Sequence, residues 1–235
     1  MNNCKIAFIN LKYILTCILF VFFTLTFSGC SDPDTSSFMK AAHDGNIVEI
    51  KQYISSGTDI NRKDTEGNTA LIYALSRGLN IYGQKSNDIN VIKYLINNGS
   101  NVNLANNLGN TPLMYAAIIG NKKALLLLVE KGADIHLKNN NGNTALFLAS
   151  AAGQTHDAVL PLLKLKADIN AKDNAGLTPY TAAVYWRELN TIKEIKNHTK
   201  QNNIYLETSE YDYYPTKTYG LFENSTSNSD YSMSR

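Results

Sequence analysis

Cysteine is scarce in this chain, and the sequence motifs of common catalytic sites are missing. The 235 residues include three cysteines, Cys4, Cys17 and Cys30. The first two lie in an N-terminal segment that we expect to be removed, so the mature chain has no pair for an internal disulfide. There are four histidines, scattered along the chain, and no serine-hydrolase, zinc-protease or phosphate-loop motif. We therefore expect no enzyme, no cofactor and no metal site.

The chain also lacks an excess of either charge. It has 22 Lys and Arg and 20 Asp and Glu, and removal of Lys5 and Lys12 with the N-terminal segment leaves 20 of each sign. A balanced chain gives no electrostatic reason to bind nucleic acid. Hydrophobic residues make up 44% of the chain and charged residues 18%, which excludes a wholly disordered chain and a multi-span membrane protein.

Residues 1–30 have the layout of a secretory signal peptide. Lys5 and Lys12 precede an apolar run from Tyr13 to Phe27, which ends in small residues. The run of about 15 residues is shorter than the roughly 20 that a membrane span requires. We predict that residues 1–29 are a signal peptide and that 30–37 form a short tether.

The segment Phe27-Ser28-Gly29-Cys30 resembles the lipobox of bacterial lipoproteins, with Phe27 where Leu is usual. The resemblance implies that Cys30 is acylated and becomes the new N-terminus, so that the membrane is reached through a lipid anchor. An Asp directly after the Cys would resemble the signal that retains such lipoproteins in the inner membrane. Because Ser31 follows Cys30 instead, we expect the protein in the bacterial cell envelope, anchored at the outer membrane and facing the periplasm. The alternative is an uncleaved signal anchor with Cys30 an ordinary residue.

Two short motifs recur in phase through the middle of the chain. The first has Asp or Asn, then Gly three residues on, then Thr, with the glycines at Gly67, Gly109, Gly142 and Gly176. The second has Asp or Asn two residues after its first residue, which is Gly57, Gly99, Gly132 or Lys166. Together they resemble the ankyrin repeat, whose period is 33 and whose marks are D-x-x-G-x-T-P-L and G-A-D-V/I-N.

The resemblance implies an all-α solenoid of helix-turn-helix units joined by β-hairpin turns. We predict an ankyrin-repeat domain over 38–197, with units at about 38–61, 62–103, 104–136, 137–170 and 171–197. Four threonines are expected as helix N-caps, and two prolines as first helical residues. These residues are Thr69, Thr111, Thr144, Thr178, Pro112 and Pro179.

Several places depart from the regular pattern. Lys166 replaces a helix-ending glycine and should strain that corner. Pro161 falls inside a second helix, which predicts a late start or a bend. We expect Ser36 or Ser37 to cap the first helix, and the last helix to cover Glu188 to Asn197.

The tail, 198–235, is polar and rich in tyrosine, without a sustained period. It fits a disordered C-terminus. The alternative is that its front half folds back on the last repeat or binds a partner.

In the ankyrin family the hairpin tips and the exposed side of the first helices bind other proteins, so the resemblance implies a surface rather than a pocket. Candidate groove residues are Arg77, Ile118, Ile119, Tyr185 and Trp186, although burial by the next repeat or the tail is the competing interpretation. Candidate tip residues are Thr65, Glu66, Asn107, Leu108, Asn140, Asn141, Asn174 and Ala175, although asparagine-rich tips can simply be good turns. The insertion that gives the long glycine spacing supplies Leu79, Ile81 and Tyr82 as a third candidate.

We therefore expect a monomeric, envelope-tethered module whose partner is another protein. Exported ankyrin-repeat lipoproteins that resemble this chain serve as immunity proteins, so the resemblance implies a protein that occludes a toxin. The alternative is a periplasmic or outer-membrane scaffold or a stress-defence protein. A host-directed effector is a weaker alternative, since such proteins usually lack a signal peptide.

Overall fold

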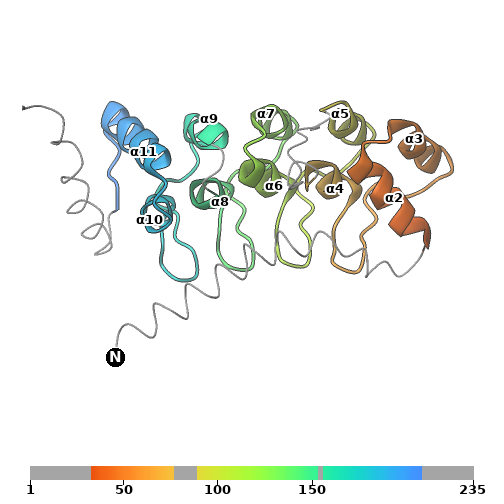
Figure 1. The fold of residues 1–235 in the computed structure, drawn as a ribbon, viewed down its shortest axis with the longest axis horizontal. Helices are drawn as coiled ribbons and strands as arrows, with labels where there is room; N and C mark the ends of the chain where they lie inside the picture. Colours follow the sequence, from red (N-terminus) through yellow and green to blue (C-terminus); the bar gives the residue numbers. More distant parts are fainter. Residues whose placement is uncertain (1–32, 77–88, 153–155, 208–235) are drawn as a thin grey trace, which may run out of the picture.

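The computed structural model describes residues 33–76, 89–152 and 156–207, and within these ranges the regular structure is helical, without strands (Figure 1). Five pairs of α-helices follow one another along the chain. The pairs are α2 (Pro33–Asp44) with α3 (Ile47–Ser55), α4 (Ala70–Ser76) with α5 (Ile89–Asn97), α6 (Pro112–Ile119) with α7 (Lys122–Glu130), α8 (Ala145–Ala151) with α9 (Val159–Lys164), and α10 (Pro179–Tyr185) with α11 (Leu189–Asn202). A short 3-10 helix, η3 (His156–Ala158), precedes α9. The predicted all-α repeat fold is confirmed.

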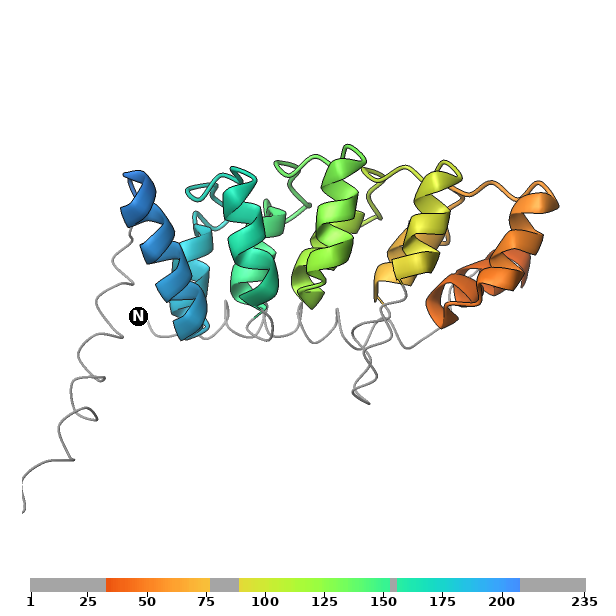
Figure 2. The same cartoon turned by 90° about the horizontal axis from the view of Figure 1, so that it is seen from above.

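The helices form two layers. The first helix of each pair (α2, α4, α6, α8, α10) packs against the first helix of the next pair, and the second helices form the other layer. Figure 1 shows the second helices along one side and the connecting hairpin loops on the opposite side. Figure 2, which looks onto the second helices, shows them side by side in one row. The array is therefore elongated, and each repeat contacts chiefly its neighbours.

The predicted threonine caps begin the first helices. The hydroxyl oxygens of Thr111, Thr144 and Thr178 accept from the backbone N–H three residues on, at 3.4, 3.2 and 3.2 Å. Thr69 makes the equivalent bond to Ile72 at 3.4 Å. Pro112 and Pro179 occupy the first helical positions after their caps. Since a proline there removes an N–H that has no intrahelical partner, both residues favour this start.

The second helices end as the repeated glycines predict. Gly57, Gly99 and Gly132 have φ of 90°, 98° and 89°, a region that costs glycine little. Lys166 takes the same place in the fourth repeat with φ of 66°. The expected strain at this corner is therefore present, because a residue with a Cβ is held in the left-handed region.

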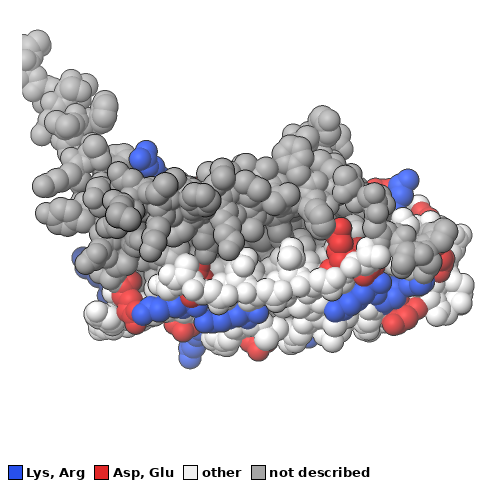
Figure 3. Space-filling view, turned by 90° about the horizontal axis from the view of Figure 1, so that it is seen from below, with Lys and Arg blue, Asp and Glu red and all other residues white. Residues whose placement is uncertain are grey.

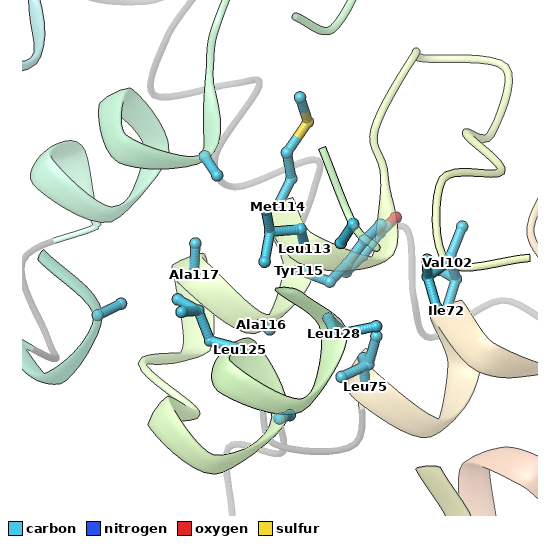
Figure 4. Close-up of a cluster of buried hydrophobic side chains, with 14 of the residues drawn as sticks. Ile72, Leu75, Val102, Leu113, Met114, Tyr115, Ala116, Ala117, Leu125 and Leu128 are labelled. Atoms are coloured by element: carbon cyan, nitrogen blue, oxygen red, sulfur yellow. The ribbon is translucent and has the colours of Figure 1, made fainter. Parts of the chain in front are cut away.

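The core lies between the layers and continues from repeat to repeat. In its centre Ile72 and Leu75 of α4, Leu113 of α6, and Leu125 and Leu128 of α7 are each no more than 2% exposed (Figure 4). Ala116 and Ala117 of α6 are fully buried, so small side chains let the first helices approach closely. A repeat alone would lack the contacts between the first helices of neighbouring repeats, so the units depend on stacking for stability.

Three helix boundaries differ from or refine the predictions. Ser36 and Ser37 lie inside α2 (Pro33–Asp44), so neither of them caps it. The predicted late start of the fourth second helix is confirmed, because η3 precedes α9 and Pro161 is the third residue of α9.

The last helix was predicted to end at Asn197, and this was too early. Thr199 is buried on the core side and its hydroxyl donates to the Ile195 carbonyl at 3.1 Å, so the helix continues to Asn202. Asn203, with φ of 52°, then ends it. Among the described helices, none combines the length and apolar character that a membrane crossing requires.

Candidate interaction surface

The predicted hairpin tips lie in one row, joined by hydrogen bonds between successive repeats. The backbone N–H groups of Asn107, Asn140 and Asn174 donate to the carbonyls of Glu66, Leu108 and Asn141 at 2.9 to 3.0 Å. The side-chain amides of the same three asparagines donate to the carbonyls of Thr65, Asn107 and Asn140 at 2.8 to 2.9 Å. Each of these three tips therefore forms one backbone and one side-chain hydrogen bond to the tip before it, and the asparagines stabilise the stacking of the hairpins.

The glycines of the tips are required by this stacking. Gly109 has φ of 77°, and a Cβ built on it would lie 2.8 Å from the backbone nitrogen of Asn140. Gly142 has φ of 80°, and its Cβ would lie 2.7 Å from the nitrogen of Asn174. Backbone cannot yield as a flexible side chain can, so the tips approach one another only because these residues lack a side chain.

Four further tip residues expose their side chains to solvent. Leu108 is 53% exposed, and Thr65, Asn141 and Ala175 are exposed as well. Since the ladder fixes the backbone beneath them, these four positions form a preorganised edge. Figure 3, seen from the hairpin side, shows basic and acidic side chains interleaved along the array.

A buried polar network supports the first two hairpins. Asn106 donates through Nδ2 to Oδ1 of Asn68 at 2.9 Å and to the hydroxyl of Tyr115 at 3.2 Å. Burial, with the nearby Asp64 carboxylate, raises the pKa of Glu66, while a hydrogen bond from Asn68 lowers it in part. Burial also raises the pKa of Tyr115 well above its usual value, with Glu66 and Asp64 adding to the effect. The network fixes the hairpins and offers no group poised for catalysis.

The predicted groove residues lie at equivalent positions, where the first helices end. Ile118 and Ile119 are half-buried at the end of α6, where Gly120 adopts φ of 69°. Tyr185 and Trp186 are half-buried at the end of α10, with their rings edge to face at 5.4 Å between centroids.

The alanines Ala151 and Ala152 hold the same positions in α8, between these two pairs, and both are half-buried. We call the six residues from α6, α8 and α10 the helix-end row. It has large apolar side chains at its two ends and small ones between, and all six are partly open to solvent. Its role in binding stays a prediction.

Other predicted site residues lie outside the described part of the chain. These are the lipidation candidate Cys30, the groove candidate Arg77, and the insertion residues Leu79, Ile81 and Tyr82.

A second inter-repeat ladder was not predicted from the sequence, although its signal is present there. Asn61 donates to the carbonyl of Gly99 at 3.1 Å and accepts from the N–H of Asn101 at 2.7 Å. Asn103 makes the same pair of bonds to Gly132 and Asp134, at 2.9 and 2.8 Å. An asparagine recurring at the end of the second motif could have indicated this role.

Within residues 33–76, 89–152 and 156–207, no group of three or more His, Cys, Asp or Glu could hold a metal ion. The site that the geometry offers is a surface fixed by two ladders, with apolar and aromatic side chains at its helix-end row. Such a surface suits recognition of another macromolecule.

Comparison with known families agrees with this geometry. The sequence matches the family described as "Ankyrin repeats (3 copies)" over residues 38–139, 79–173 and 132–205. No curated protein matches the chain. Ankyrin repeats are generally non-enzymatic modules of protein–protein interaction, and no catalytic family is identified. The matched windows span most of the sequence, and the chain therefore belongs to the ankyrin-repeat family.

Proposed function

We propose that this chain is an envelope-tethered module that binds another protein through its helix-end row and hairpin tips. The observation that carries the proposal is the placement of Ile118, Ile119, Tyr185 and Trp186, partly open, at equivalent ends of the first helices. Aromatic and large aliphatic side chains of this kind are the usual anchors of a protein interface.

The finer proposal is an immunity or inhibitor protein that occludes a toxin or effector. The hairpins are joined by hydrogen bonds before any partner arrives, so little conformational entropy is lost on binding. An inhibitor of a toxic enzyme needs high affinity from a surface of ordinary size, and preorganisation favours this. The signal-peptide layout of residues 1–30 supports this role, because an exported and tethered inhibitor would meet an incoming toxin in the envelope.

Tethering rests on acylation of Cys30, which is a proposal from the sequence. Two or three acyl chains hold a protein firmly on a bilayer, whereas one chain binds reversibly. Mass spectrometry of the N-terminal peptide, from protein extracted from its native membrane, tests this step. An acylated Cys30 at the N-terminus supports it, and an intact segment 1–29 contradicts it.

Co-culture tests the inhibitory role. A strain lacking the gene is grown beside toxin-producing siblings, with the same strain complemented by the wild-type gene as the control. The proposal predicts that the deletion strain is killed and the complemented strain survives. Equal survival of the two strains contradicts it. A growth defect of the deletion strain in monoculture, with no toxin present, indicates an envelope scaffold instead.

A further inference from the structure

The outward side of the second-helix layer is rich in lysine. The helices α3, α5, α7, α9 and α11 contain eight lysines and three glutamates. All eight lysines are exposed; of the glutamates only Glu130 is exposed, whereas Glu49 and Glu194 are half-buried. We call this outward side the second-helix face. Its lysines are Lys51, Lys93, Lys122, Lys123, Lys164, Lys193, Lys196 and Lys200.

The connecting loops have a different charge balance. Residues 57–69, 99–111, 132–144 and 166–178 contain six acidic and five basic residues. These loops run from the ends of the second helices to the hairpin tips on the opposite side of the molecule in Figure 1. Several loop lysines are also engaged: Lys63 donates to the Ala105 carbonyl at 2.7 Å and Lys138 to that of Lys172 at 2.8 Å. Positive charge is therefore concentrated on one side of a chain that is nearly neutral overall.

The central lysines of the second-helix face are available for a partner. The side-chain ammonium groups of Lys122, Lys123 and Lys164 form no hydrogen bond or ion pair with another described residue. Lys51 and Lys196 instead lie over the rings of Tyr94 and Tyr180, at 5.5 and 5.6 Å from the ring centroids. Lys93 of α5 and Lys193 and Lys200 of α11 likewise have no side-chain partner among the described residues, so the available charges run from α5 to α11, with three of the six on α7 and α9.

Exposed leucines lie among these lysines. Leu126 of α7 is 42% exposed and Leu160 of α9 is 37% exposed. Each lies six residues before the residue that ends its helix, Gly132 or Lys166, so the two leucines occupy equivalent positions on adjacent second helices. Lys122 and Lys123 precede Leu126 by one helical turn, and Lys164 follows Leu160 by one turn. Exposed leucine beside lysine is typical of helices that lie in a membrane interface.

We propose that the second-helix face lies against a phospholipid surface that carries negative charge, with Leu126 and Leu160 entering the headgroup region. The charge complementarity selects this occupant, because several unpaired lysines on one face attract a surface of many anionic headgroups. The five second helices form one row, so many of these lysines reach such a surface together (Figure 2). The hairpin tips then point away from the bilayer.

This orientation goes beyond the proposed function, because it does not depend on which protein the hairpin side binds. It can also be tested separately from the proposed function. Anionic lipid alone, with no partner protein present, should protect the lysines of the second-helix face.

Lysine labelling on vesicles tests the proposal. Full-length protein, purified from its native membrane, is reconstituted into phosphatidylcholine vesicles with and without phosphatidylglycerol. Labelling of each lysine by an amine-reactive reagent is followed by mass spectrometry. We expect labelling of Lys122, Lys123 and Lys164 to fall about threefold or more with phosphatidylglycerol and to recover in high salt. Lys63 and Lys138 on the hairpin side are the internal controls and should not respond.

Equal labelling of Lys122, Lys123 and Lys164 in the two kinds of vesicle overturns the proposal. Protection that depends on protein concentration in both kinds of vesicle also overturns it, because the face would then cover a second copy of the chain.

A pair of charge-reversal variants separates this face from the rest of the molecule. The variant K122E/K123E/K164E is compared with K63E/K138E/K172E, which has the same change in net charge on the hairpin side. Circular dichroism first establishes that both are folded. The proposal predicts that only the first variant loses the lipid-dependent protection of Lys93 and Lys193, and equal loss in both contradicts it. Retained binding of the protein partner by the first variant keeps this test separate from that of the proposed function.

Discussion

The side-chain amide of Asn170 donates to the carbonyl of Tyr205 at 2.8 Å, and its Oδ1 accepts from the N–H of Glu207 at 2.9 Å. Asn61 and Asn103 make the same pair of bonds, to a carbonyl and to the N–H two residues on, in the next repeat. The segment after α11 therefore occupies the place of a further repeat's turn. It closes the C-terminal edge of the ladder, where a repeat would otherwise leave an asparagine unpaired.

The substitution Asn170→Ala should release this segment. It removes both hydrogen bonds and should cost about 1–2 kcal/mol of unfolding free energy. Hydrogen exchange followed by mass spectrometry should show loss of protection at 204–207 while α8 and α9 keep theirs. Asn141→Ala, at an exposed tip position, is the control and should leave that protection unchanged. Unaltered exchange at 204–207 in the Asn170 variant would show that the docking does not rest on this residue.

Stacking of the hairpins predicts that two glycines with similar backbone angles differ in their tolerance of alanine. Gly132→Ala should cost about 1 kcal/mol, because φ is 89° but no atom lies within 4 Å of the new Cβ. Gly109→Ala should cost about 2 kcal/mol or more, because its Cβ would also meet the backbone of Asn140 at 2.8 Å. Urea unfolding of the two variants measures the difference. Equal losses would mean that the tips are not packed as described.

The strained corner at Lys166 should be relieved by glycine. Lys166→Gly removes the Cβ at φ of 66° and should raise the unfolding free energy by about 0.5–1 kcal/mol, visible as a higher Tm. Lys164→Gly, two residues earlier inside α9, makes the same chemical change in a helical position. It should lower stability by roughly 0.5–1 kcal/mol. A lower Tm for the Lys166 variant would refute the left-handed conformation of this residue.

The raised pKa of Glu66 predicts a stability effect that depends on pH. An acid whose pKa is higher in the folded state binds its proton more tightly there, so the folded state loses stability as pH rises through the folded pKa. Glu66→Gln removes this charge and can still accept from Asn68. The variant should have a higher Tm than the parent chain at pH 7. The gain should shrink as pH falls toward about 4, where the parent Glu66 is also protonated. A gain that is constant with pH would contradict burial of the charge.

Much of the repeat architecture was predictable because each repeated letter has a local physical role. Thr111 caps a helix whose proline follows it, and Gly99 ends a helix in a region that only glycine adopts cheaply. These effects act within a few residues, so the sequence alone indicates them. The end of α11 was placed too early because the residues after Asn197 show no apolar pattern. Thr199 is polar, yet it is buried in the structure, and its hydroxyl donates to a carbonyl of its own helix.

The surface was less predictable, because its properties arise between repeats. Asn140 looked like a turn former or a contact residue, and only the stacked structure shows its amide bonded to Asn107. The grouping of Leu126 with Leu160 required the two helices to be placed side by side. Tyr185 and Trp186 could be named from their place in the repeat, and their partial exposure required the packed structure.

The central claim is that the helix-end row binds a protein, and affinity capture from the native envelope tests it most directly. The tagged full-length protein is compared with Tyr185→Ala/Trp186→Ala and with the control Leu126→Ala/Leu160→Ala on the opposite layer. The partner's amount relative to the bait is read by mass spectrometry from toxin-exposed cells. We expect one stoichiometric partner, retained by the control and reduced at least tenfold with the first variant, which corresponds to about 1.4 kcal/mol or more. A partner retained equally by all three proteins would contradict the claim.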